Sequence, residues 1–141
     1  MTEDDIPYVI EGEMKAFKTT LGYDLLSTEI NHNPYANYYV LEIEKRVCGY
    51  IGFWITFETA EVINFYIDKE YQGMGFGKKL LSFALDRCRE RNVRMISLEV
   101  RENNYKAINL YKGLGFKVSH KRERYYSDNT NALVMIKEFE V

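Results

Sequence analysis

The feature that most constrains this chain is residues 61–100, where a strand pattern, a glycine-rich loop, an amphipathic helix and a second strand pattern follow in order. Residues 61–68 and 94–100 carry the β-branched and aromatic side chains typical of strands. Between them, apolar residues recur at the spacing of one helix face: Leu80, Leu81, Ala84, Leu85 and Cys88. Two strands joined through a helix form a βαβ unit with parallel strands. The sequence therefore predicts a parallel strand pair at the centre of the fold.

The patterns around this unit predict a mixed sheet covered by helices. Helices are expected over 3–17, 22–31 and 104–113, and Ile6, Val9, Ile10 and Met14 are expected to share the buried face of the first. The remaining strands follow one another closely and should pair antiparallel: 38–44, 47–57, 116–120 and 132–138. Low-complexity tracts and linkers are absent from the sequence, so 1–141 is expected to form one α/β (α+β) domain.

Charge and composition exclude several classes of function. A net charge of −2 gives no broad surface for nucleic acid, so no nucleic-acid partner is expected. No apolar stretch approaches the roughly 20 residues that span a bilayer, and the start lacks a basic segment followed by an apolar run. Cys48 and Cys88 lack CxxC spacing, and His32 and His120 stand alone, so no metal is expected. We expect a cytoplasmic protein without a membrane partner, as a monomer or weak dimer.

The loop at the centre of the βαβ unit, Gln72–Lys79, has the features of an anion site. Gly73, Gly75 and Gly77 let the backbone approach a ligand without interference from a Cβ. The following helix offers unpaired N–H groups and the positive end of its dipole, which suit a phosphate or pyrophosphate. Lys78 and Lys79 add positive charge in a first turn where the dipole alone disfavours it.

Two common phosphate motifs do not match this loop. A P-loop would need a glycine where this chain has Gln72 and a hydroxyl residue where it has Lys79. A dinucleotide fingerprint counted from Gly73 would need a glycine where it has Lys78. A tight turn that uses glycine for geometry alone remains open as an alternative.

The motifs along the chain resemble those of the GCN5-related N-acetyltransferases (GNAT superfamily). The resemblance is carried by Gln72-x-x-Gly75-x-Gly77 opening a helix, by Leu98-Glu99-Val100-Arg101 with Asn104, and by Leu110-Tyr111 followed by Gly115-Phe116. Arg124-Tyr125-Tyr126 and residues 132–135 resemble one branch, the ribosomal-protein-alanine N-acetyltransferases. The similarity covers about residues 38–137. It implies an acetyl-CoA-dependent acyltransferase in which the parallel strands splay apart to admit the cofactor.

The resemblance also implies a set of cofactor contacts. The backbone of Phe65, Tyr66 and Ile67 would pair with the pantetheine amides, and the N–H groups of the loop would hold the pyrophosphate. The residues implied in that loop are Gln72, Gly73, Met74, Gly75, Phe76, Gly77 and Lys78. Asn104 would touch the cofactor. A role as helix N-cap is an equally good interpretation of this residue, and the two roles do not exclude each other.

Two residues are the candidates for proton transfer. Glu99 alternates with the apolar Leu98 and Val100, and a carboxylate near the end of a central strand needs a partner or solvent. By resemblance it is the general base that takes a proton from the substrate ammonium through a water. By pattern alone, Tyr111 is interpreted as a half-buried aromatic residue that fixes its helix on the sheet. By resemblance it also lies at the cofactor and is the general acid that protonates the CoA thiolate.

Some residues depart from the family pattern on the acceptor side. The chain has no strand pattern before its first helix, and Phe17 is followed by Lys-Thr-Thr-Leu-Gly where this branch has Pro-Trp. Ser127 and Asn131 replace an expected proline and aspartate. Acetylation of a protein N-terminal α-amine, with a ribosomal protein as a candidate acceptor, is the leading hypothesis. Acetylation of a small amine or polyamine, or acetyl-CoA sensing without turnover, are the alternatives.

Overall fold

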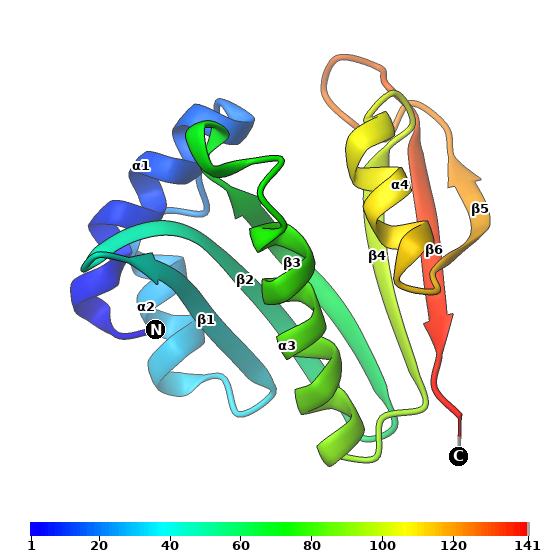
Figure 1. Cartoon of the computed structure of the whole chain (residues 1–141), viewed down its shortest axis with the longest axis horizontal. Coiled ribbons are helices and arrows are strands. Elements are labelled where there is room, and N and C mark those ends of the chain that lie inside the picture. Colours follow the sequence, from blue (N-terminus) through cyan, green and yellow to red (C-terminus); the bar gives the residue numbers. More distant parts are fainter. Residues whose placement is uncertain (141) are drawn as a thin grey trace.

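The computed structural model describes residues 1–140, and its elements follow the predicted order (Figure 1). The helices are α1 (Ile6–Phe17), α2 (Tyr23–His32), α3 (Phe76–Glu90) and α4 (Tyr105–Gly113), with short 3₁₀ turns η1 (Glu3–Asp5) and η2 (Lys69–Tyr71). The strands are β1 (Ala36–Ile43), β2 (Arg46–Thr56), β3 (Thr59–Ile67), β4 (Met95–Arg101), β5 (Lys117–Arg122) and β6 (Ala132–Glu138). None of the helices in this part of the chain is long and apolar enough to cross a membrane.

One six-stranded sheet in the order β1-β2-β3-β4-β6-β5 forms the centre of the molecule. Every neighbouring pair is antiparallel except β3 and β4, as the βαβ unit predicts. That parallel pair is joined only from Thr59–Glu61 to Met95–Ser97. Beyond Glu61 the two strands diverge, and Figure 1 shows them opening toward the end where β3 leaves the sheet. The predicted mixed sheet with a splayed parallel pair is confirmed.

Helices cover both faces of the sheet, and each face has its own core. On one face α3 and α4 pack on a cluster that includes Leu81, Leu98 and Phe116. On the other face α1 and α2 pack on three buried tyrosines of the first strands, Tyr38, Tyr50 and Tyr66. The second core covers only β1–β3, so the same face of β4, β6 and β5 carries no helix (Figure 1).

The buried face of α1 differs from the predicted one. Ile6 and Val9 are fully buried as expected, but Met14 is 47% exposed and Glu13 is fully buried in its place. Polar partners explain the burial of Glu13. Its carboxylate accepts hydrogen bonds from the Tyr50 hydroxyl at 2.8 Å, the Asn64 amide at 2.7 Å and a third donor, the Thr20 hydroxyl, at 2.6 Å. Hydropathy alone cannot find such a position, because its partners come from two distant strands and a loop.

We expect a Glu13→Ala variant to lose about 3 kcal/mol of unfolding free energy, because three donors, one of them the buried Tyr50 hydroxyl, would lose their acceptor. Urea denaturation followed by circular dichroism measures this loss. The matched control is Glu11→Ala on the same helix, which removes only a surface ion pair with Lys15 and should change stability by less than about 0.5 kcal/mol. Equal effects of the two substitutions would contradict the buried network.

Candidate functional site

The opening between β3 and β4 leaves backbone groups of β3 without a strand partner. Phe65, Tyr66 and Ile67 pair with β2 on one side, whereas on the other side pairing with β4 has ended at Glu61. The Ile67 carbonyl on this free edge accepts a hydrogen bond from Gln72 Nε2 at 2.9 Å. The Phe65 N–H also has a local partner, because it donates to the Asn64 side-chain oxygen at 3.1 Å. An extended ligand that adds to this edge as a short strand would pair with the other polar groups of the edge or displace these two local hydrogen bonds.

The glycine loop presents a row of free backbone N–H groups. Across residues 1–140, no hydrogen bond uses the N–H groups of residues 73–78, at the start of α3. Gly73 and Gly75 lie in the left-handed region, with φ of +80° and +86°, which a residue with a Cβ adopts at a cost. At both positions a Cβ would point into open space. The loop is therefore open on the side where the first turn of α3 offers its donors and its positive dipole end.

The charges beside this loop are available to a ligand. Lys78 and Lys79 are exposed, and neither forms an ion pair within the described chain. Met74 is 63% exposed, and Phe76 packs against Tyr71 with ring centroids 6.2 Å apart. Gln72 has a structural part in the loop, since its side chain closes the loop onto Ile67 instead of pointing away from it.

α3, β3 and α4 meet at Gly77. A Cβ placed there would lie 3.5 Å from Leu110 Cδ2, 3.7 Å from Ile67 Cγ1 and 3.8 Å from Phe65 Cζ. The loop end, the free edge of β3 and the middle of α4 are therefore neighbours, although they are far apart in the sequence. Alanine fits at Gly77 in ordinary contact, so a small residue is what this close approach requires.

Asn104 caps the N-terminus of α4. Its side-chain oxygen accepts a hydrogen bond from the Ala107 N–H at 3.2 Å, so the structural interpretation of this residue is confirmed. The side chain is exposed, and its Nδ2 donates no hydrogen bond to any residue that the structure describes. That amide remains available to a ligand.

Tyr111 lies on α4 and faces the opening between the strands. It is buried, and its ring centroid lies 6.4 Å from that of Phe65 on β3 and 5.8 Å from that of Phe116. Burial raises the pKa of its phenol well above the usual value, with a smaller contribution from Tyr126. The hydroxyl therefore keeps its proton through the neutral and alkaline range, and it makes no hydrogen bond within residues 1–140.

Glu99 lies on the opposite face of the sheet from Tyr111. Its neighbours Leu98 and Val100 point into the core under α3 and α4, so Glu99 points to the face that α1 and α2 only partly cover. The carboxylate is 25% exposed and lies 3.4 Å from the Arg122 guanidinium. Its charge raises the pKa of the Tyr125 phenol, mainly through a hydrogen bond, and also raises that of Tyr126, where burial is the larger cause.

Tyr126 is thus within electrostatic reach of both candidate groups, and sequence analysis left it outside the site. The loop that carries it is held by Arg101, which lies 4.1 Å from the Tyr126 ring centroid and forms two hydrogen bonds with Asp128, at 3.0 and 2.8 Å. Asn131, where the family pattern has an aspartate, donates to Glu102 at 2.8 Å and thereby anchors the end of the loop. The Tyr-Tyr motif was visible in the sequence, but only the tertiary structure brings it to Glu99.

The comparisons with known proteins agree with this geometry. Residues 6–116 match the model of the Acetyltransferase (GNAT) family. The chain belongs to this family. The acetyltransferase is accordingly an acyltransferase with acetyl-CoA as the donor, as the resemblance implied.

The acetyltransferase is similar in sequence and structure to proteins that are named as N-acetyltransferases of a ribosomal protein. It is 38% identical over 136 residues to a Bacillus subtilis protein provisionally named a ribosomal protein bS18-alanine N-acetyltransferase, covering 96% of this chain and 90% of the relative. The crystal structure of the ribosomal-protein-S18-alanine N-acetyltransferase from Escherichia coli superimposes with a TM-score of 0.90 at 25% identity, covering 100% and 92% of the two chains. The structure of Ard1 from Thermoplasma volcanium has a TM-score of 0.90 at 27% identity, with 100% and 95% covered.

Proposed function

We propose that this acetyltransferase is a single catalytic domain that transfers the acetyl group of acetyl-CoA to the N-terminal α-amine of a peptide or protein. The observation that carries the proposal is the placement of Glu99 and Tyr111 on opposite faces of the sheet, beside the opening between β3 and β4. Cofactor and acceptor can then enter from the two faces and meet between the strands. The relatives named for N-terminal acetylation support this acceptor class.

The donor is proposed to bind on the side of α3 and α4. The free N–H groups of residues 73–78, with Lys78 beside them, hold the pyrophosphate. The free edge of Phe65–Ile67 pairs with the pantetheine arm and directs the thioester toward Tyr111, whose ring faces Phe65. The Asn104 amide is placed to contact the cofactor at the start of α4.

The reaction is proposed as direct attack without a covalent intermediate. Glu99 takes a proton from the acceptor ammonium through a water, and the free amine attacks the thioester carbonyl. As the C–S bond breaks, Tyr111 gives its proton to the departing thiolate. The nitrogen of the adduct loses its second proton as the amide forms, and this proton restores the Tyr111 phenol. The raised pKa of Tyr111 keeps the proton in place until that moment, because the phenol stays neutral at the pH of the reaction.

An acceptor panel tests the function. The protein is incubated with acetyl-CoA and with Ala-starting peptides, lysine peptides carrying a blocked N-terminus, or polyamines, and free thiol is followed. We expect release with Ala-starting peptides. Release with polyamines alone would move the function to a small-amine acetyltransferase. Tight CoA binding without release in any mixture would identify a sensor.

We expect Tyr111→Phe to lower kcat about 10- to 100-fold, because the thiolate then leaves without a proton donor. The control is Tyr105→Phe on the same helix, whose side chain is 72% exposed and which should retain wild-type kcat. Since the pKa of Tyr111 is raised, deprotonation of this residue should not lower the wild-type rate up to pH 10. A wild-type rate in Tyr111→Phe would remove the residue from the chemistry.

A further inference from the structure

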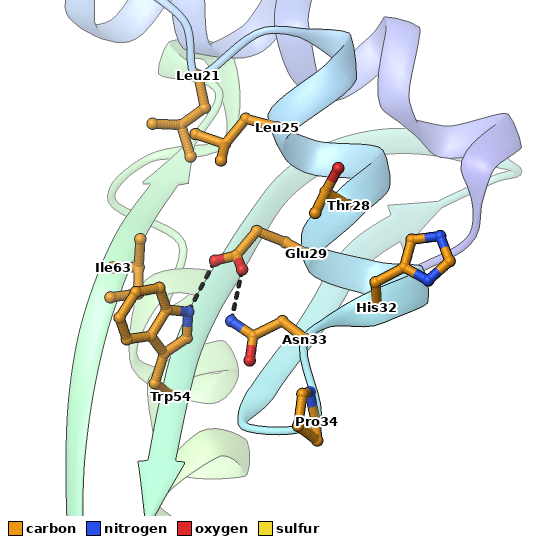
Figure 2. A pocket seen from close by; sticks show the side chains of 9 residues that line it. All are labelled: Leu21, Leu25, Thr28, Glu29, His32, Asn33, Pro34, Trp54 and Ile63. Carbon is orange, nitrogen blue, oxygen red and sulfur yellow. Dashed lines mark hydrogen bonds between the residues drawn. The ribbon is translucent and has the colours of Figure 1, made fainter.

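A pocket of about 600 Å³ lies between α2 and the outer part of β2 and β3 (Figure 2). Its walls are mostly apolar: Leu21 and Leu25 on one side, and Trp54 and Ile63 of the sheet on the other. Leu25 is 48% exposed, so it borders the mouth of the pocket. None of the cofactor-side residues lines this pocket, which is on the α1 and α2 face of the sheet.

The Trp54 wall is held in place by a buried carboxylate. The indole N–H of Trp54 donates to Glu29 Oε1 at 2.7 Å, and the Tyr38 hydroxyl donates to the same oxygen at 2.9 Å. Asn33 donates to the other oxygen of Glu29 (Figure 2). The polar edge of the indole is thus turned to Glu29, and its ring remains as an apolar surface.

The Glu29 carboxylate also makes the pocket electronegative. The residue is only 6% exposed, and its described partners are neutral donors rather than a cation. A negative charge in this poorly solvated position repels a second carboxylate and disfavours its desolvation. The pocket is therefore suited to an uncharged apolar group and unsuited to an acidic one.

Ile63 links one wall of the pocket to the opening between β3 and β4, since it lies on β3 just beyond the last residue paired with β4. Glu61 and Ser97 are the last paired residues of β3 and β4, and counting two residues further reaches Ile63 and Glu99. Ile63 lines the pocket beneath α2, and Glu99 points to the same face of the sheet. Because β3 and β4 diverge beyond Glu61, Ile63 and Glu99 are further apart than the roughly 4.8 Å that separates paired strands. An extended acceptor peptide spans about 3.4 Å per residue, so the side chain of its second residue can bridge this opening from Glu99 toward Ile63.

We propose that this pocket receives the side chain of the acceptor's second residue and selects a large apolar side chain over an acidic one. This inference rests on the proposed function, because it assumes a peptide whose N-terminal amine lies at Glu99. It adds a specificity site formed by α2, β2 and β3, with Glu29 as the positioning residue for Trp54 and as the group that excludes carboxylates.

The test compares kcat/KM for peptides that start with Ala-Leu, Ala-Ala and Ala-Glu and are otherwise identical. We expect Ala-Leu to exceed Ala-Ala by about tenfold, in line with burial of one aliphatic side chain, and Ala-Glu to be the poorest acceptor. Acetylation of none of the peptides would overturn the proposed function and this proposal with it. Equal values for all three would overturn the pocket assignment alone.

A positive charge introduced at the mouth gives the second measurement. Leu25→Arg should lower kcat/KM for Ala-Leu and raise it for Ala-Glu, so that the ratio of the two falls by about tenfold or more. Tyr23→Arg is the matched control, because it lies on the same helix, is 46% exposed and does not line the pocket. The proposal fails if both variants change the ratio alike, or if Leu25→Arg leaves it unchanged.

Discussion

A Glu99→Gln variant is expected to turn over at least a hundredfold more slowly than the wild type at neutral pH while binding CoA with nearly unchanged affinity. The amide keeps the size of the carboxylate but cannot accept the proton of the acceptor ammonium. Glu99 lies on the acceptor face, 3.4 Å from Arg122, and away from the loop at the start of α3, so donor binding should not depend on its charge. Thiol release measures kcat, and calorimetric titration measures CoA affinity.

The pH dependence of this variant separates loss of a base from loss of an ion pair. If Glu99 is the base, raising the pH should restore part of the rate, because more of the acceptor amine is then already deprotonated. Glu58→Gln is the control, since Glu58 forms an exposed pair with Arg94 at 3.6 Å in the turn before β3. A wild-type rate for Glu99→Gln at neutral pH would show that another group acts as the base.

Gly75→Val is expected to abolish measurable CoA binding, with Kd raised by more than about 100-fold, equivalent to about 2.7 kcal/mol. The φ of +86° at this position is costly for a β-branched residue, and relaxation of that strain would move the N–H groups that follow. The new side chain would also project into the open space in front of the loop, where the proposed pyrophosphate lies.

Gly22→Val provides a matched control for this prediction. Gly22 has the same φ of +86°, stands at the N-cap of α2 and also has open space around a Cβ. Its ψ of 161° lies in a region that is essentially restricted to glycine, whereas Gly75 has a ψ of 2° in the left-handed helical region, so the backbone cost at Gly22 is at least as large. That cost falls on a helix start that is not proposed to bind the cofactor. Calorimetric titration with CoA should separate the two variants, and thermal unfolding reports the loss of stability in each. Unchanged CoA affinity in Gly75→Val would contradict the anion site.

The sequence by itself determined the element order and the central βαβ unit. The alternation in 94–100 and the helical spacing of Leu80 to Cys88 depend on local geometry, because side chains repeat every 2 residues in a strand and every 3.6 in a helix. Asn92 follows the C-cap of α3 with a φ of +59°, the left-handed conformation that asparagine adopts at helix C-termini for local reasons. The candidate anion loop can be read from the sequence for the same reason, since its glycines, its helix start and its lysines are contiguous in the chain.

The tertiary structure decided which polar groups are buried and which residues share the site. Glu13 and Glu29 are buried because donors from distant strands and loops reach them, and no local pattern contains that information. The pairing of β3 and β4 stops after three residues, and this brings Glu99, on one face, and Tyr111, on the other, to the same opening. The proposed donor side was thus readable from contiguous residues, whereas the proposed acceptor side is assembled from α2, β2, β3 and the loop before β6, which meet only in the folded chain.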